Sequence, residues 1–248
     1  MPRAALLLML AAAARADLPR GQVIDPVLSL ADPAQSYALY LPCRYDEGRD
    51  WPILFCFDPR GRGAVPVGLF KAAAERFGWI VAGSNNSRNG PWETILAAAR
   101  VLWRDTHARL RIDDRRIYAA GFSGGARVAS GLARMLSIRP AGVIGCGGGL
   151  PEWLEPGDVA ATPWFGLVGM SDFNFPEMQE LAARLRQQGT ASRLRVFQGR
   201  HEWPPASLVG EAVAWLNEIA AAPGAHTLEK VDYLLPDWYG RRRAGENR

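Results

Sequence analysis

The chain has 248 residues, of which 48% are hydrophobic and 22% are charged. This length suffices for one domain with a sizeable core and is short for two. The composition excludes a mainly disordered chain, a coiled coil and a polytopic membrane protein. The net charge is +4, and the arginines that dominate the positive charge are scattered among Asp and Glu residues, which argues against a nucleic-acid partner.

The N-terminus has the pattern of a secretory signal peptide. Arg3 gives a positive start, residues 4–14 form an unbroken apolar run, and Ala14-Arg15-Ala16 is an A-x-A cleavage signal. The alternative is a transmembrane anchor, but the run is shorter than the roughly 20 residues that a spanning helix needs. We therefore predict that residues 1–16 are removed. The mature protein would then be secreted or periplasmic, with no membrane association.

Strands and helices alternate along the rest of the chain. Short apolar runs predict strands at 36–41, 53–57, 79–82, 116–120, 141–146, 164–168 and 194–197. Amphipathic and Ala-rich segments predict helices at 67–77, 92–110, 124–136, 178–188 and 208–221. This alternation predicts the α/β class, with a mostly parallel central sheet flanked by helices. We expect one domain over 17–222, followed by a C-terminal extension over 223–248.

The cysteines do not predict a metal site. Cys43, Cys56 and Cys146 are far apart and show no C-x-x-C spacing. Cys56 and Cys146 lie in apolar runs typical of buried strands. An odd count leaves at least one thiol free or in an intermolecular bond, and a Cys43–Cys56 disulfide stays open.

One serine lies in a G-x-S-x-G motif, formed by residues 121–125. A predicted strand ends just before the motif and a predicted helix begins just after it, which is the context of a nucleophile elbow. In such a turn the hydroxyl of Ser123 projects above the sheet, and the helix N-terminus favours developing negative charge. The alternative is a glycine-rich turn that only packs closely. We predict that Ser123 is a nucleophile.

A serine nucleophile needs a base, and the chain has only three histidines: His107, His201 and His226. His107 lies within a predicted helix and His226 in the C-terminal tail. His201 follows the strand at 194–197, at the sheet edge where Ser123 is expected and where open α/β sheets bind ligands. We therefore predict that His201 is the general base.

The third member of a triad orients the imidazole and stabilises its charged form. Asp172 follows the strand at 164–168 and gives the chain order Ser, Asp, His that is described for this kind of elbow. We predict that Asp172 is the acid. Other acidic residues near strand ends remain as alternatives: Glu152, Glu155, Asp158 and Glu202.

From about residue 36 to 220 the chain resembles the α/β-hydrolase superfamily, and more narrowly secreted polyhydroxybutyrate depolymerases and feruloyl esterase-like serine esterases. The resemblance rests on three stretches: residues 36–42, residues 112–125 with the elbow, and His201-Glu202-Trp203-Pro204, which is similar to the His-x-Trp-Pro of that group. It implies an α/β-hydrolase fold and a serine carboxylesterase that works through an acyl-enzyme.

The chain departs from this family after the strand at 53–57. The family usually has His-Gly there, whereas this chain has Asp58-Pro59. An oxyanion hole needs two N–H donors, and Pro59 has none. We expect the amides of Gly124 and Arg60, with that of Gly61 as the alternative to Arg60. The residues at 58–61 also suit a simple turn.

Features on the predicted catalytic face bear on the substrate. Trp92, Trp153 and Trp203 each follow a predicted strand end and would form an apolar wall for an acyl or aromatic group, unless they only pack against loops. Asn85 also ends a strand on this face and would bind a polar group of the substrate. The stretch between Cys146 and Trp164 is too short for a helical lid, so we expect an open site.

These features predict a serine hydrolase that cleaves small-molecule or polymeric carboxylic esters. Nothing resembles a phosphate-binding or dinucleotide-binding loop, so no cofactor and no metal are expected. Two alternatives remain: a serine peptidase of the prolyl-oligopeptidase type, and a catalytically silent binding protein on a hydrolase scaffold. The sequence does not determine the oligomeric state.

Overall fold

The structure is a computed structural model and describes residues 18–221. Its strands are β1 (Val23–Leu28), β2 (Ser36–Tyr40), β3 (Trp51–Phe57), β4 (Ile80–Ser84), β5 (Ile112–Phe122), β6 (Gly142–Cys146), β7 (Trp164–Gly169) and β8 (Ser192–Phe197). Its helices are α2 (Ala64–Phe77), α3 (Trp92–Arg109), α4 (Gly124–Leu136), the short 3-10 helix η1 (Pro156–Val159), α5 (Phe175–Gln187) and α6 (Ala206–Ala221).

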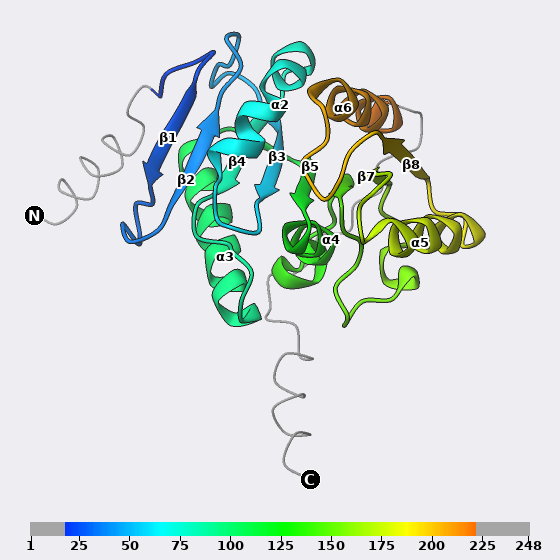
Figure 1. The fold of residues 1–248 in the computed structure, drawn as a ribbon. Coiled ribbons are helices and arrows are strands. Elements are labelled where there is room, and N and C mark those ends of the chain that lie inside the picture. The colour runs from blue at the N-terminus through cyan, green and yellow to red at the C-terminus, as the bar shows by residue number, and fades with distance from the viewer. Residues whose placement is uncertain (1–17, 222–248) are drawn as a thin grey trace, which may run out of the picture.

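All eight strands form one sheet in the order β1-β2-β4-β3-β5-β6-β7-β8. β2 is antiparallel to both of its neighbours, and every pair from β4 to β8 is parallel. The carboxyl ends of the parallel strands therefore meet at one edge of the sheet, which is the edge where such folds bind ligands (Figure 1).

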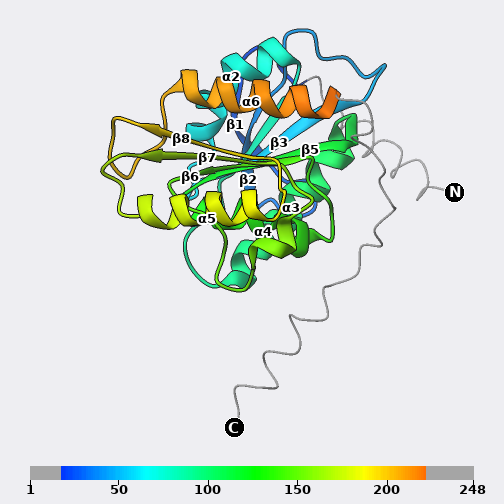
Figure 2. The ribbon, with the colours of Figure 1, turned by 90° about the vertical axis from the view of Figure 1, so that its right-hand side faces the viewer.

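Two helical layers cover the two faces of the sheet. Figure 2 shows α2 and α6 on one face and α3, α4 and α5 on the other. The central strands alternate their side chains between these layers: Ile53 and Phe55 of β3 pack on the side of α3, α4 and α5, whereas Leu54 and Cys56 pack on the side of α2 and α6. All of these side chains are buried. This explains why β3 appears in the sequence as a continuous apolar run.

The predicted fold class is confirmed, and the connection from β6 to β7 holds only the short helix η1 and no helical lid. β1 was not predicted, because Asp25 and Pro26 interrupt its apolar pattern. An edge strand tolerates a proline because one side of it needs no ladder hydrogen bonds. The predicted signal peptide at 1–16 and the extension at 223–248 lie outside the described residues. Within 18–221, no helix has both the length and the apolar character that a bilayer crossing requires.

The cysteines in the described region are all unpaired. Cys43 is exposed, and Cys56 and Cys146 are buried in β3 and β6. The open Cys43–Cys56 disulfide is therefore not formed, and the two strand cysteines serve as small apolar side chains.

Candidate active site

Ser123 lies in the tight turn between β5 and α4. Its φ of 55° and ψ of −120° are unusual for a residue with a side chain, and the surrounding contacts enforce them. A Cβ on Gly121 would overlap the carbonyl oxygen of Gly125, and a Cβ on Gly125 would overlap that of Phe57. The glycines of the motif are thus required by the close approach of the helix to the strands, which leaves the hydroxyl at the open edge of the sheet.

The structure brings the three predicted catalytic side chains into one hydrogen-bonded line. His201 Nε2 lies 2.9 Å from Ser123 Oγ, and His201 Nδ1 lies 2.9 Å from each carboxylate oxygen of Asp172. Asp172 is buried, while the His201 side chain keeps 21% of its exposure. A carboxyl group at Nδ1 favours the tautomer that carries its proton there, and Nε2 then faces the hydroxyl as an acceptor.

A loop after β7 fixes Asp172 in place. The backbone N–H of Asn174 donates to Asp172 Oδ1 at 2.8 Å, and the Asn174 side-chain amide donates to the carbonyl of Gly147 at 2.8 Å. Gly147, at the end of β6, lies directly against the carboxylate. Asn174 was missed in the sequence, although its position two residues after a candidate aspartate is typical of an Asx turn.

The alternative acids point to other partners. Glu155 and Asp158 cap η1 and pair with Arg184 and Arg134. Glu152 accepts from the indole of Trp92 at 3.1 Å, and Glu202 accepts from the amide of Arg200 at 3.0 Å. His107 stacks on Trp103 and contacts Asp114. Among the residues described, His201 and Asp172 are therefore the pair that faces Ser123.

A bidentate ion pair braces the elbow from behind. Arg127 of α4 contacts Glu177 of α5 at 2.6 and 2.8 Å and also donates to the carbonyl of Leu150. The guanidinium lowers the pKa of the Glu177 carboxyl below its usual value, and Glu177 in turn raises the pKa of Arg127. This pair ties the helix behind Ser123 to the helix that follows Asp172.

Asp58, directly after β3, joins two loops at the site. Its buried carboxylate accepts from Nε and Nη2 of Arg62, each at 3.0 Å, and from the indole N–H of Trp203 at 3.0 Å. Burial raises the pKa of this carboxyl, but the hydrogen bonds from Arg62, Trp203 and the Arg60 amide outweigh burial and bring the pKa below its usual value. The loop after β3 and the loop that carries His201 are therefore held together by one ionised group.

The hydrogen bonds of Asp58 do not agree with the predicted second donor of the oxyanion hole. The amide of Arg60 donates to Asp58 Oδ1 at 2.9 Å, and that of Gly61 donates to the Asp58 carbonyl at 3.0 Å. Both amides expected to supply the second donor are thus engaged within their own turn. The simple-turn interpretation describes residues 58–61 better than the prediction that Arg60 is a donor. The amide of Gly124, at the N-terminus of α4, keeps the position expected of the first donor.

The predicted substrate-binding residues do not form one wall. Trp92 and Trp153 pack edge to face at 5.3 Å and belong to the layer of α3, α4 and α5. Trp203 packs with Phe122 at 5.6 Å in the opposite layer, and its N–H is held by Asp58. Asn85 donates to Asp25 and Ser36 and accepts from the Gly63 amide, so its carboxamide supports the loops.

An aromatic side chain that the sequence analysis missed lies beside the imidazole. The ring centroid of Phe173 is 4.1 Å from that of His201, and this residue is 73% exposed. Met170, in the same loop after β7, is also exposed. An exposed phenyl ring at this position is unusual for packing alone and is available to a bound molecule. Its only signal in the sequence is that it follows Asp172.

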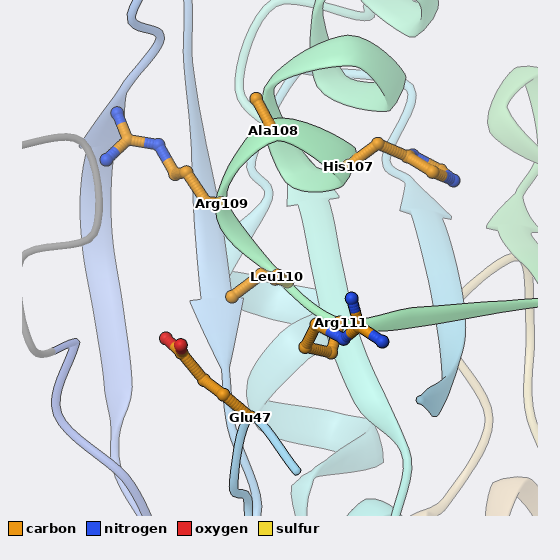
Figure 3. A pocket seen from close by; sticks show the side chains of 6 residues that line it. All are labelled: Glu47, His107, Ala108, Arg109, Leu110 and Arg111. Atoms are coloured by element: carbon orange, nitrogen blue, oxygen red, sulfur yellow. The ribbon is translucent and has the colours of Figure 1, made fainter. Parts of the chain in front are cut away.

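A small surface pocket elsewhere is formed by Glu47, His107, Ala108, Arg109, Leu110 and Arg111 (Figure 3). Arg111 directly precedes β5, so this pocket lies near the amino ends of the parallel strands, away from the edge that carries Ser123. No cluster of three or more His, Cys, Asp or Glu side chains suited to a metal ion is found within residues 18–221.

Comparison with solved structures identifies proteins that share this fold. No protein-family model and no curated protein matches the chain. Among solved structures, a ferulic acid esterase is similar with a TM-score of 0.62 at 17% identity, over 79% of this chain and 98% of that one. S-formylglutathione hydrolase from Staphylococcus aureus gives a TM-score of 0.62 at 12% identity, over 82% and 100%. An esterase from Pyrobaculum calidifontis gives 0.61 at 13%, over 90% and 94%. The chain has the α/β-hydrolase fold.

Proposed function

We propose that this protein is a serine carboxylesterase that cleaves esters through an acyl-enzyme on Ser123. The observation that carries the proposal is the continuous hydrogen-bonded line from Asp172 through His201 to a strained serine at the open sheet edge. Esterases among the structures with the same fold are consistent with this activity.

The geometry supports a two-step reaction. His201 Nε2 takes the hydroxyl proton as Ser123 Oγ attacks the ester carbonyl carbon, and the imidazolium then gives that proton to the leaving alcohol as the C–O bond breaks. In the second step, His201 takes a proton from water as the water attacks the acyl-enzyme, and it returns that proton to Ser123 Oγ as the acyl C–O bond breaks and the carboxylic acid leaves. The Gly124 amide and the N-terminus of α4 stabilise the negative charge on the carbonyl oxygen in both steps.

The substrate of this proposal is an ester with an apolar or aromatic group. The exposed ring of Phe173 lies beside the His201 imidazole and offers apolar contact there, and Met170 adds a second exposed apolar side chain in the same loop. The absence of a lid between β6 and β7 makes the site accessible to small and polymeric esters alike. Activity should therefore follow simple saturation, without a jump when the substrate forms an interface.

Export is part of the proposal. The signal-peptide pattern of residues 1–16 is consistent with a secreted or periplasmic esterase whose mature chain begins at Asp17. N-terminal sequencing of the protein recovered outside the cytoplasm tests this, and a sequence that begins at Met1 would reject it.

The decisive experiment is trapping with a fluorophosphonate followed by peptide mapping. We expect one phosphonyl group on Ser123 and hydrolysis of p-nitrophenyl esters that falls by at least about 10³-fold in Ser123→Ala. Ser130→Ala is the matched control, because Ser130 is a buried serine of α4, the helix that follows the elbow. A wild-type protein that neither reacts with the phosphonate nor hydrolyses esters would be a binding protein. Faster turnover of peptide amides than of matched esters would indicate the peptidase.

A further inference from the structure

The site as described has one oxyanion donor, whereas acyl transfer requires a pair. A tetrahedral intermediate places a full negative charge on the former carbonyl oxygen, and preorganised N–H donors lower its energy. Of the turn after β3, Pro59 has no N–H, and the amides of Arg60 and Gly61 both donate to Asp58. Neither of the two amides expected to complete the pair is available, so we consider donors on other elements.

The carboxamide of Asn89 lies directly against Gly124. A Cβ placed on Gly124 would overlap Oδ1 of Asn89 and would lie 3.2 Å from its Nδ2. The Asn89 carboxamide therefore occupies the space into which a side chain at position 124 would extend. This contact puts an amide side chain beside the one backbone N–H already assigned to the oxyanion.

The backbone of Asn89 is held in place, whereas its side chain is not engaged. Its backbone N–H donates to the carbonyl of Pro59 at 2.9 Å, which fastens the loop after β4 to the turn after β3. The side-chain amides of the nearby Asn85 and Asn86 both form hydrogen bonds to other loops and strands. The carboxamide of Asn89, in contrast, is exposed and has no hydrogen-bond partner within residues 18–221.

We propose that Asn89 is a catalytic residue whose Nδ2–H supplies the second oxyanion donor, together with the backbone N–H of Gly124. This inference rests on the proposed esterase function. The last torsion of an asparagine is broad and roughly two-fold, so that a half-turn brings Nδ2 to the place of Oδ1 against Gly124 at little cost. In this role, the side-chain amide replaces the backbone amide of Arg60, which donates to Asp58 instead.

The test is a set of variants assayed for ester hydrolysis and for binding of a transition-state analogue. We expect Asn89→Ala to lower kcat by about 10²–10³-fold with little change in KM, because the donor acts on the oxyanion rather than on the bound ester. The affinity for a trifluoromethyl ketone, which forms a tetrahedral adduct on the serine, should fall by a similar factor. Asn89→Asp should be at least as impaired at neutral pH, since an ionised carboxylate repels the oxyanion.

Two controls keep the outcomes separate. Arg88→Ala changes the adjacent exposed residue of the same loop and should retain wild-type kcat, and a thermal melt shows whether each variant is folded. If the wild-type protein reacts with the fluorophosphonate at Ser123 but folded Asn89→Ala keeps wild-type kcat and ketone affinity, the esterase proposal stands and the role of Asn89 is rejected. If the wild type shows no reaction and no turnover, the proposed function itself fails.

Discussion

Gly147 offers a sharp test of the proposed triad, because a single methyl group there would disturb it without altering any of its members. The residue has a φ of +54°. A Cβ at this position would lie 2.8 Å from Asp172 Oδ2, 2.9 Å from Phe122 Cε2 and 3.4 Å from His201 Nδ1. The backbone of Gly147 cannot easily withdraw, since its N–H donates to Leu167 and its carbonyl accepts from Asn174.

Gly147→Ala should therefore have two separable costs. The positive φ costs an alanine roughly 1–2 kcal/mol of stability. The methyl group also displaces the Asp172 carboxylate or the ring of Phe122, and a misplacement on the order of 1 Å in a catalytic group costs about 10²-fold in rate. Gly189→Ala isolates the first cost, because Gly189 has a φ of +75° and a Cβ there would meet nothing within 4 Å.

The assay compares urea unfolding with kcat/KM for a p-nitrophenyl ester in both variants. We expect both to lose stability to a similar extent, and only Gly147→Ala to lose about 10²-fold in kcat/KM. Wild-type kcat/KM in Gly147→Ala would show that Asp172 does not need its observed position. An equal loss of activity in Gly189→Ala would show that general destabilisation, rather than displacement of the triad, accounts for the effect.

Three further perturbations address the ion pair behind the elbow, the exposed phenyl ring beside His201 and the hydrogen bond between Trp203 and Asp58. Because Arg127 depresses the pKa of Glu177, the contribution of this pair to stability is present above the unfolded-state value of about 4.3 and is lost as pH falls toward the folded-state pKa. Glu177→Gln should flatten the dependence of unfolding free energy on pH below about 5, and a pH profile identical to that of the wild type would refute this role. Phe173→Ala should raise KM for a phenylacetyl ester about tenfold while acetate esters change little, since apolar contacts discriminate by roughly 1–3 kcal/mol. Trp203→Phe, which removes the hydrogen bond to Asp58, should lower the melting temperature and kcat for both esters alike, and a selective loss on the aromatic ester would instead place Trp203 on the substrate.

The sequence alone determined the sheet, the elbow and the order of the three candidate catalytic residues. These features depend on local patterns: an apolar run is buried wherever parallel strands form, and G-x-S-x-G between a strand and a helix leaves few backbone solutions. His201 could be selected because it follows a predicted strand at the correct edge. β1 was not predicted, because Asp25 and Pro26 interrupt the alternation of apolar and polar residues that marks a strand.

Only the tertiary structure decided how the loops at the sheet edge share their polar groups. The Asp58 carboxylate accepts hydrogen bonds from the Arg60 amide and from the indole N–H of Trp203, which is far away in the sequence. The side chain of Asn89, in the loop after β4, lies against Gly124. No spacing rule encodes these contacts, because each joins side chains from separate strand ends whose distance is set by the packing of the whole sheet. Hydrogen-bond donors act over about 3 Å, so which of them remain available to a substrate depends on that packing and not on residue type.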